Sequence, residues 1–206
     1  MSRMVLGQAS PSVRSVEWPI RTPRLLLRPI AADDVDALLT YRSDPSVQHY
    51  TGRGAMSRDD VQERIASSLS RMQPDADHPM VALAVVDRSD GAVRGDAMIG
   101  FRPARTVGAE TAEWEGVVGY SLHQDFHGRG WGGEVGKALL DIAFGTLDLR
   151  RVTADVFADN EPSRRLLERL GMRVEGRSVQ AVLGKDGRWW DDLHLAILRD
   201  EWQPNG

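Results

Sequence analysis

The hydrophobic pattern divides the chain into short apolar runs and longer stretches with helical spacing. Apolar runs typical of strands cover residues 24–28, 80–87, 96–102, 113–122, 152–157, 174–183 and 188–198. Helical spacing covers residues 33–42, a stretch after Ser57, a stretch after the glycines near position 130, and residues 160–170. The resulting order, β-α-α-β-β-β-α-β-α-β-β, predicts a mixed α/β sheet flanked by helices.

The clearest amphipathic helix follows those glycines. Its apolar positions fall at i, i+3, i+4, i+7 and i+8, and they are Val135, Ala138, Leu139, Ile142 and Ala143. This spacing predicts a helix that packs one face on a sheet. The helix after Ser57 has a start similar to a capping box, with Asp60 in the place of the usual Glu.

A glycine-rich turn lies between the strand of residues 113–122 and this helix. Its glycines are Gly128, Gly130, Gly132 and Gly133. Glycine permits positive φ and close approach of a ligand to the main chain. The first N–H groups and the positive dipole end of the helix lie at the same place. The turn therefore predicts a phosphate or diphosphate site.

Two other phosphate-binding patterns fit this turn less well. A Walker loop fails because Trp131 stands where a glycine is needed and Ala138 where Ser or Thr is needed. A dinucleotide fingerprint is present from Gly128 to Gly133, with Asp155 about 20 residues further on. However, five residues separate the strand from Gly128, and fewer than 80 residues follow the turn, too few for a second nucleotide-binding half.

Composition limits the class of protein. With 206 residues and 41% hydrophobic content, the chain can bury one sizeable core, which predicts a single domain. The net charge is −4, and there is no long block of Lys and Arg, so we expect no nucleic-acid ligand. An acidic protein suits a basic protein or polyamine partner. The chain has no cysteine, which excludes disulfides and a cysteine acyl-enzyme.

The chain lacks the signals of a membrane or secreted protein. No apolar run approaches the roughly 18 residues of a membrane span, so we expect no membrane partner. The first 19 residues mix Arg, Ser, Gln and Pro without an apolar run typical of a signal peptide. We therefore expect residues 1–19 to form a mobile N-terminal extension, residues 20–206 to form the domain, and the protein to be cytoplasmic.

The turn and its flanks resemble a known family. His127-Gly-Arg-Gly-Trp-Gly-Gly133 is similar to the Q/R-x-x-G-x-G/A motif with which the GNAT acetyltransferase superfamily holds the diphosphate of acetyl-CoA. Stretches similar to the RimJ/RimL branch are residues 22–29, 149–157, 160–163, 166–172, 187–194 and 201–202. The resemblance implies a mixed, mostly antiparallel sheet with splayed central strands. It also implies direct transfer of an acetyl group from acetyl-CoA to an amine.

The resemblance assigns roles to the strand and the turn. The backbone of residues 118–122, which include Tyr120, Ser121 and Leu122, lies beside the pantetheine arm, and one N–H polarises the thioester carbonyl. The diphosphate-binding residues are His127, Gly128, Arg129, Gly130, Gly132 and Gly133. An ordinary buried strand and an exposed arginine remain the alternatives for these two segments.

Asn160 and Ser163 occupy the next matching segment. The resemblance has the Asn160 amide reaching the pantetheine arm, while its alternative role is to cap the helix by accepting from Ser163 N–H. Many family members carry a tyrosine acid one turn further on, where this chain has Leu167. Ser163 is then the nearest hydroxyl to protonate the leaving thiolate. His127 and Gly133 also depart from the family's usual residues.

No carboxylate stands out as the general base. Glu115 is the best candidate by position, and Glu113 is the next. Asp191, before the last strand, is expected to face the acceptor amine. His194 is a base by residue type but is more often structural. A register error of one residue turns any of these side chains away from the site. No metal ligand set is predicted.

The only constraint that the sequence places on the acceptor concerns the pKa of its amine. An α-amine with a pKa near 8 needs about 1.4 kcal/mol to lose its proton at pH 7, whereas lysine needs more than about 4 kcal/mol. A site without a committed base therefore suits a protein or peptide N-terminus. A polyamine, an amino acid or an aminoglycoside is the alternative acceptor, and a non-catalytic acyl-CoA sensor is the alternative function. The sequence leaves open a monomer or a homodimer.

Overall fold

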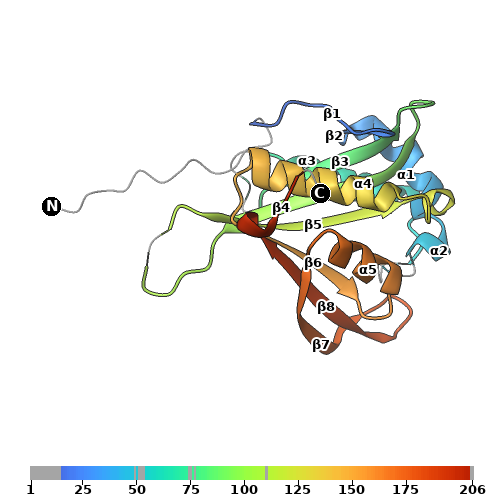
Figure 1. Cartoon of the computed structure of the whole chain (residues 1–206). Helices are drawn as coiled ribbons and strands as arrows, with labels where there is room; N and C mark the ends of the chain where they lie inside the picture. Colours follow the sequence, from blue (N-terminus) through green and yellow to red (C-terminus); the bar gives the residue numbers. More distant parts are fainter. Residues whose placement is uncertain are drawn as a thin grey trace.

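One eight-stranded sheet with helices on both faces forms the protein in the computed structural model (Figure 1). The structure describes residues 15–48, 50, 54–73, 76, 78–109 and 111–204. The strands lie in the order β1-β2-β3-β4-β5-β6-β8-β7. Every neighbouring pair is antiparallel except β5 and β6, which are parallel. The predicted mixed, mostly antiparallel sheet is confirmed.

The strands are β1 (Ile20–Arg21), β2 (Leu25–Pro29), β3 (Met80–Asp87), β4 (Val93–Pro103), β5 (Trp114–Leu122), β6 (Arg151–Phe157), β7 (Arg173–Leu183) and β8 (Trp189–Leu198). The α-helices are α1 (Val35–Arg42), α2 (Pro45–Gln48), α3 (Arg58–Arg71), α4 (Trp131–Asp141) and α5 (Glu161–Arg169). Short 3₁₀ turns and a π-helix (Ile142–Thr146) complete the described elements.

Local sequence explains where the helices begin. Ser57 and Asp60 form the predicted reciprocal capping box at the start of α3. Asn160 caps α5 by accepting from Ser163 N–H. The short helix α2 was not predicted, because Pro45 was expected to end the preceding helix rather than to begin a new one.

The sheet is buried on both faces by separate hydrophobic clusters. One lies between the sheet and α4 and includes Leu25, Leu83, Ile99, Val135 and Leu139. The other lies between the sheet and the helices α1 and α3, and includes Leu38, Tyr41, Val61, Ile65 and Ala82. Because β3 is covered on both sides, its side chains read as a continuous apolar run rather than as an alternation.

The first cluster also includes part of the predicted N-terminal extension. Val16 is 5% exposed and packs in this cluster, and Trp18 packs against it. Val16 and Trp18 therefore contact the core of the folded domain, while the boundary at residue 19 stays a prediction. The rest of the predicted extension, residues 1–14, lies outside the described residues.

The central strands separate along their length. β5 and β6 pair only at their beginnings, through Glu115 with Arg151, Gly116 with Val152 and Val117 with Thr153. In the described chain, residues 118–122 and 154–157 have no pairing across this gap. The splay that the resemblance implied is thus confirmed, and it leaves one edge of β5 open beside the start of α4.

Candidate active site

The glycine turn adopts the backbone that its composition predicted, at two of its four glycines. Gly128 has φ 71° and Gly130 has φ 79°, both in the left-handed region. Gly132 and Gly133 are instead helical residues of α4. A Cβ on Gly132 would lie 2.8 Å from Leu166 Cδ1, whereas a Cβ on Gly133 would meet no atom within 4 Å. Gly132 therefore permits helix packing, and Gly133 leaves open space at the first turn.

The first turn of α4 is an exposed group of backbone donors. Its N-cap residue is Gly130, which has no side chain, and no side-chain cap is present. The N–H groups of Trp131, Gly132 and Gly133 have no intrahelical acceptor by helix geometry. Together with the helix dipole, these donors favour an anion. The start of α4 is therefore uncapped, with open space at Gly133, and the phosphate site stays a prediction.

Arg24 supports the turn from a distant part of the sequence. Its backbone N–H and its Nε each donate to Glu134 at 2.8 Å, and its Nη1 donates to the Arg129 carbonyl at 2.7 Å. Its Nη2 would lie 3.4 Å from a Cβ on Gly130. The resemblance covers residues 22–29, but the sequence alone gives Arg24 no role. Only the fold brings β2 beside this turn.

Glu134 is the anchor of this contact. Burial alone would raise the pKa of Glu134, but hydrogen bonds from Thr22 and Arg24 outweigh burial and lower it. Glu134 therefore stays ionised at neutral pH and holds the Arg24 guanidinium against the glycines.

The side chains of His127 and Arg129 make contacts within the turn. His127 Nε2 lies 3.0 Å from the Leu122 carbonyl oxygen, which joins the end of β5 to the turn. The Arg129 guanidinium lies 5.6 Å from the centre of the Phe126 ring. Trp131 is buried and packs on the same ring, as expected for a packing residue.

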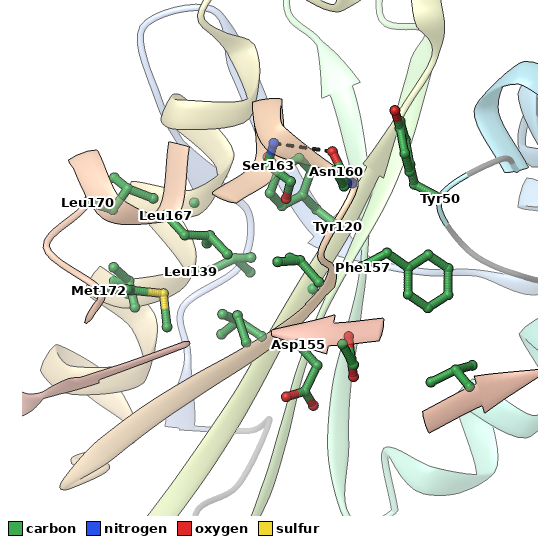
Figure 2. Close-up of a pocket in the computed structure, with 18 residues that line it drawn as sticks. Tyr50, Tyr120, Leu139, Asp155, Phe157, Asn160, Ser163, Leu167, Leu170 and Met172 are labelled. Carbon is green, nitrogen blue, oxygen red and sulfur yellow. Dashed lines mark hydrogen bonds between the residues drawn. The ribbon is translucent and has the colours of Figure 1, made fainter. Parts of the chain in front are cut away.

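A cavity of about 300 Å³ fills the gap between β5 and β6 (Figure 2). It is lined from β5 by Val118, Gly119 and Tyr120, and from β6 by Ala154, Asp155 and Phe157. Side chains from α4 and α5 also line it. In Figure 2, Asn160 and Ser163 lie at one end of the cavity and Asp155 at the other.

Two of the three predicted strand residues do not line this cavity. Ser121 is opposite Asp96 on β4, and the Leu122 side chain is buried in the cluster under α4. Tyr120 does line the cavity. Ser121 and Leu122 continue β5 from the cavity towards the turn.

Asn160 caps α5 with its amide oxygen and does not use its amide nitrogen for this contact. Its Oδ1 accepts from Ser163 N–H at 3.3 Å, shown as the dashed line in Figure 2. Its Nδ2 has no hydrogen-bond partner among the described residues. Because the side chain lines the cavity, Nδ2 is free to donate to a ligand there. The two roles considered for Asn160 are therefore compatible.

Ser163 lies beside the partly buried phenol of Tyr120. Burial raises the pKa of Tyr120, and a side-chain hydrogen bond with Ser163 opposes that rise. Both residues line the cavity. Leu167, at the position of the family's tyrosine, is buried and also lines it. Ser163 and Tyr120 are thus the hydroxyls that α5 and β5 bring together; the sequence named Tyr120 for its place on the cofactor strand and gave its hydroxyl no role.

The predicted bases lie elsewhere. Glu115 accepts from Arg150 Nη1 at 2.6 Å and lines a second cavity, whereas Glu113 is an exposed partner of the same arginine. Asp191 accepts from Arg177 Nε at 2.9 Å and from the backbone of Gln180 at 2.7 Å. None of the three carboxylates lines the cavity between β5 and β6.

The carboxylates that do line this cavity are Asp155 and Asp192. Burial raises the pKa of Asp192, and the nearby charge of Asp155 raises it further. Sequence reasoning chose Asp191, one residue away, and that single step in a strand points the side chain to the other face. No Lys or Arg lines the cavity in the described part of the chain.

An uncapped helix start beside a cavity between splayed strands is the arrangement of an acyl-CoA-dependent acyltransferase. The sequence profile of the family described as "Acetyltransferase (GNAT) domain" matches residues 24–173. The chain therefore belongs to the GNAT family, and it is an N-acetyltransferase.

Characterised and uncharacterised proteins resemble the chain. An uncharacterised N-acetyltransferase, YnaD of Bacillus subtilis, is 27% identical over 89% of this chain and 98% of its own length. The ribosomal protein uS5-alanine N-acetyltransferase of Escherichia coli is 32% identical over 42% of this chain and 44% of its own length. The structure of Mycobacterium smegmatis RimJ in complex with CoA-disulfide has a TM-score of 0.70 and is 25% identical, covering 89% of this chain and 87% of that one.

The length and composition of the helices are relevant to the expectation that no segment spans a membrane. Among the described residues, none of them has the length and apolar character needed to cross a bilayer.

Proposed function

We propose that this N-acetyltransferase moves the acetyl group of acetyl-CoA directly to the α-amine at the N-terminus of a protein or peptide. The observation that carries the proposal is that the uncapped start of α4 lies next to the cavity between β5 and β6: a Cβ on Gly132 would lie 3.0 Å from the hydroxyl of Tyr120, which lines the cavity. A diphosphate at the first site and a pantetheine arm in the second match the two ends of one ligand.

The glycine turn fits the diphosphate because it offers main-chain donors and open space. The N–H groups at the start of α4 bind the phosphate oxygens, and the open position at Gly133 lets them approach. The Arg24 guanidinium adds positive charge over Gly130. Asn160 Nδ2 donates to the arm inside the cavity.

The reaction follows from what the cavity contains. The chain has no cysteine, so the amine attacks the bound thioester without an acyl-enzyme of that kind. An N–H on the open edge of β5 polarises the thioester carbonyl. Ser163 protonates the departing thiolate, which has a pKa of about 8.5 and leaves readily.

The acceptor class is supported by charge and by relatives. The cavity carries two carboxylates and, among the described residues, no lysine or arginine, so it attracts a cationic amine. A protein similar to part of this chain is named as an alanine N-acetyltransferase of ribosomal protein uS5. An N-terminal α-amine also needs less energy to lose its proton than lysine does.

The first prediction is that peptides with a free N-terminus accept the acetyl group. Thiol release from acetyl-CoA is measured with a peptide that begins with alanine, with the same peptide N-acetylated as the control, and with spermidine. We expect release with the free peptide and background release with the blocked one. Turnover on spermidine alone would replace the acceptor class, and tight CoA binding without turnover on any amine would make the protein a sensor.

A further inference from the structure

A chain of three hydrogen-bonded side chains crosses the sheet at the edge of the cavity. Asp155 Oδ1 lies 2.8 Å from His194 Nδ1, and His194 Nε2 lies 2.7 Å from Ser178 Oγ. The three residues come from β6, β8 and β7, which are neighbours in the sheet. Asp155 is directly opposite His194 in the pairing of β6 with β8.

Asp155 lies where two cavities meet. It lines the cavity between β5 and β6, and it also lines the second cavity together with His194, Thr153 and Glu115. Thr153 and Asp155 alternate with Val152 and Ala154, which are buried in the cluster under α4. The second cavity therefore lies on the opposite face of the sheet. Asp155 therefore lies between the gap and the second cavity, whose lining also includes Arg71, Arg102 and Arg151.

We propose, on the basis of the function proposed above, that Asp155 is the catalytic proton acceptor for the amine. His194 is its positioning residue, and Ser178 fixes the orientation of the imidazole. With Asp155 ionised, Nδ1–H donates to Asp155 and Nε2 accepts from the Ser178 hydroxyl. This arrangement leaves the second oxygen of Asp155 for the substrate.

The proton and electron count is simple. The amine nitrogen forms a bond to the thioester carbonyl carbon, and this makes its N–H much more acidic. The N–H bond then breaks, its electron pair stays on nitrogen, and the proton passes to the second oxygen of Asp155. The carbon–sulfur bond breaks, its electron pair leaves on sulfur, and the thiolate takes a proton from Ser163 or from solvent.

Nearby charges explain why this carboxylate is the available one. Glu115 is held by Arg150, and in the same cavity Arg151 donates to Glu175. Each of those carboxylates therefore already has an arginine partner. Asp155 has the imidazole of His194 as its partner in place of an arginine.

The pKa of His194 is raised, and this gives the proposal a testable pH dependence. The hydrogen bond with Asp155 raises the pKa of His194, burial opposes this, and the charges of Asp155 and Asp192 raise it further. Ser178 on β7 also contacts the ring. The other charged or titratable groups that line the second cavity with His194 are Arg71, His78, Arg102, Glu115 and the Arg151–Glu175 pair. When the ring is protonated, its positive charge lies beside Asp155 and repels a cationic amine. Activity should therefore rise as pH increases through the raised His194 pKa.

The experiment compares Asp155→Asn with Asp159→Asn. The two carboxylates are 53% and 54% exposed, and Asp159 pairs with Arg188 and lines neither cavity. Thiol release is measured with the most active acceptor of the peptide panel and with water as a slow acceptor. We expect Asp155→Asn to lower kcat by about 100-fold with little change in the KM for acetyl-CoA. Asp159→Asn should match the wild type.

Glu115→Gln tests whether Glu115, rather than Asp155, accepts the proton of the amine. A loss of kcat in Glu115→Gln with an unchanged Asp155→Asn would transfer the role to Glu115 and overturn the proposal. His194→Gln should lose the pH-dependent rise in kcat while it keeps more activity than Asp155→Asn.

A readout without substrate separates this proposal from the function on which it rests. Imidazole resonances of His194 are followed by NMR over pH in the free protein. The pKa of His194 should fall in Asp155→Asn and stay unchanged in Asp159→Asn. An unchanged His194 pKa in Asp155→Asn overturns the proposal, even if peptides are acetylated. Failure of every amine acceptor overturns the proposed function instead, and loss of the slow release to water in Asp155→Asn still supports the role of Asp155.

Discussion

Asp96 connects α1 to the middle of the sheet through a buried ion-pair cluster. It accepts from Tyr41 Oη at 2.6 Å and from Arg42 Nη2 at 2.5 Å, and Arg64 approaches its other oxygen at 3.2 Å. Arg42 is 3% exposed, so it cannot find a replacement partner in water. The cluster lies opposite Ser121, close to the end of the proposed cofactor strand.

Removing this carboxylate should therefore destabilise the protein without touching the cavity. Asp96→Asn leaves Arg42 buried and unpaired, which costs about 3–5 kcal/mol in the free energy of unfolding. Urea denaturation measures the change. Asp36→Asn is the control, because Asp36 is 78% exposed in its pair with Arg58, and it should change stability by less than about 0.5 kcal/mol. A similar small change in both variants would contradict this account.

The difference in stability between wild type and Asp96→Asn is expected to depend on pH. Burial alone would raise the pKa of Asp96, but the charges of Arg42 and Arg64 outweigh it and lower the pKa below 3.8. The stability that Asp96 contributes is present above 3.8 and is lost as pH falls through the lower folded value. The gap in stability between wild type and Asp96→Asn should narrow only in that acidic range.

Single residues also mark the limit of prediction from sequence. The sequence pointed to the pair of carboxylates before the last strand but selected Asp191 instead of Asp192. Register depends on where β8 begins and how it pairs with β6 and β7, and local sequence does not encode that pairing. His194 was weighed as a structural residue, and its partners Asp155 and Ser178 are 39 and 16 positions away.

At the scale of elements, the start of α4 has two properties that act in opposite directions. The helix dipole favours a negative side chain near its first turn. The proposed diphosphate needs the same place, and it repels such a side chain. Gly133 is the position to test, because a Cβ there meets no atom within 4 Å and its φ is helical.

Gly133→Asp should therefore stabilise the free protein and weaken CoA binding at once. The neutral control is Gly133→Asn, which has nearly the same shape. We expect Gly133→Asp to be more stable than the control by about 0.3–1 kcal/mol in urea denaturation. Its dissociation constant for CoA, measured by calorimetry, should be at least about tenfold higher than that of the control. Equal CoA affinity in the two variants would place the diphosphate elsewhere.

Most elements were predictable because their sequence signals are local. The capping box of α3, the cap of α5 and the apolar run of β3 each depend on neighbouring residues. The splay of β5 from β6 was implied only by the resemblance. The π-helix that follows α4 at residues 142–146 has the same apolar spacing as an α-helix, so the sequence does not distinguish them.

At the scale of the whole molecule, the sheet separates two cavities that are both lined by Asp155. The glycine turn and the gap are reached beside α4, while the second cavity lies on the opposite face. Asp155 is the carboxylate, within the described residues, that lines both cavities. In the proposed function, this layout would keep the diphosphate of the cofactor away from the carboxylates of the cavity.

Long-range contacts explain why this layout could not be derived from the sequence. Arg24 reaches the turn across 105 positions to Arg129 and 110 positions to Glu134. The final hairpin places β8, not β7, beside β6, so the last strand in sequence is not the last in the sheet. Neither fact has a local signal in composition or spacing.

Amide hydrogen exchange with and without CoA tests the central claim most directly. A diphosphate at the start of α4 and a pantetheine arm beside the open edge of β5 would shield amides at residues 118–122 and 131–133. The fully paired strand β3 serves as the internal reference, since general stabilisation by a bound ligand slows its exchange too. We predict that CoA slows exchange in the two segments well beyond the change in β3. Binding of CoA with no extra protection in either segment would contradict the account.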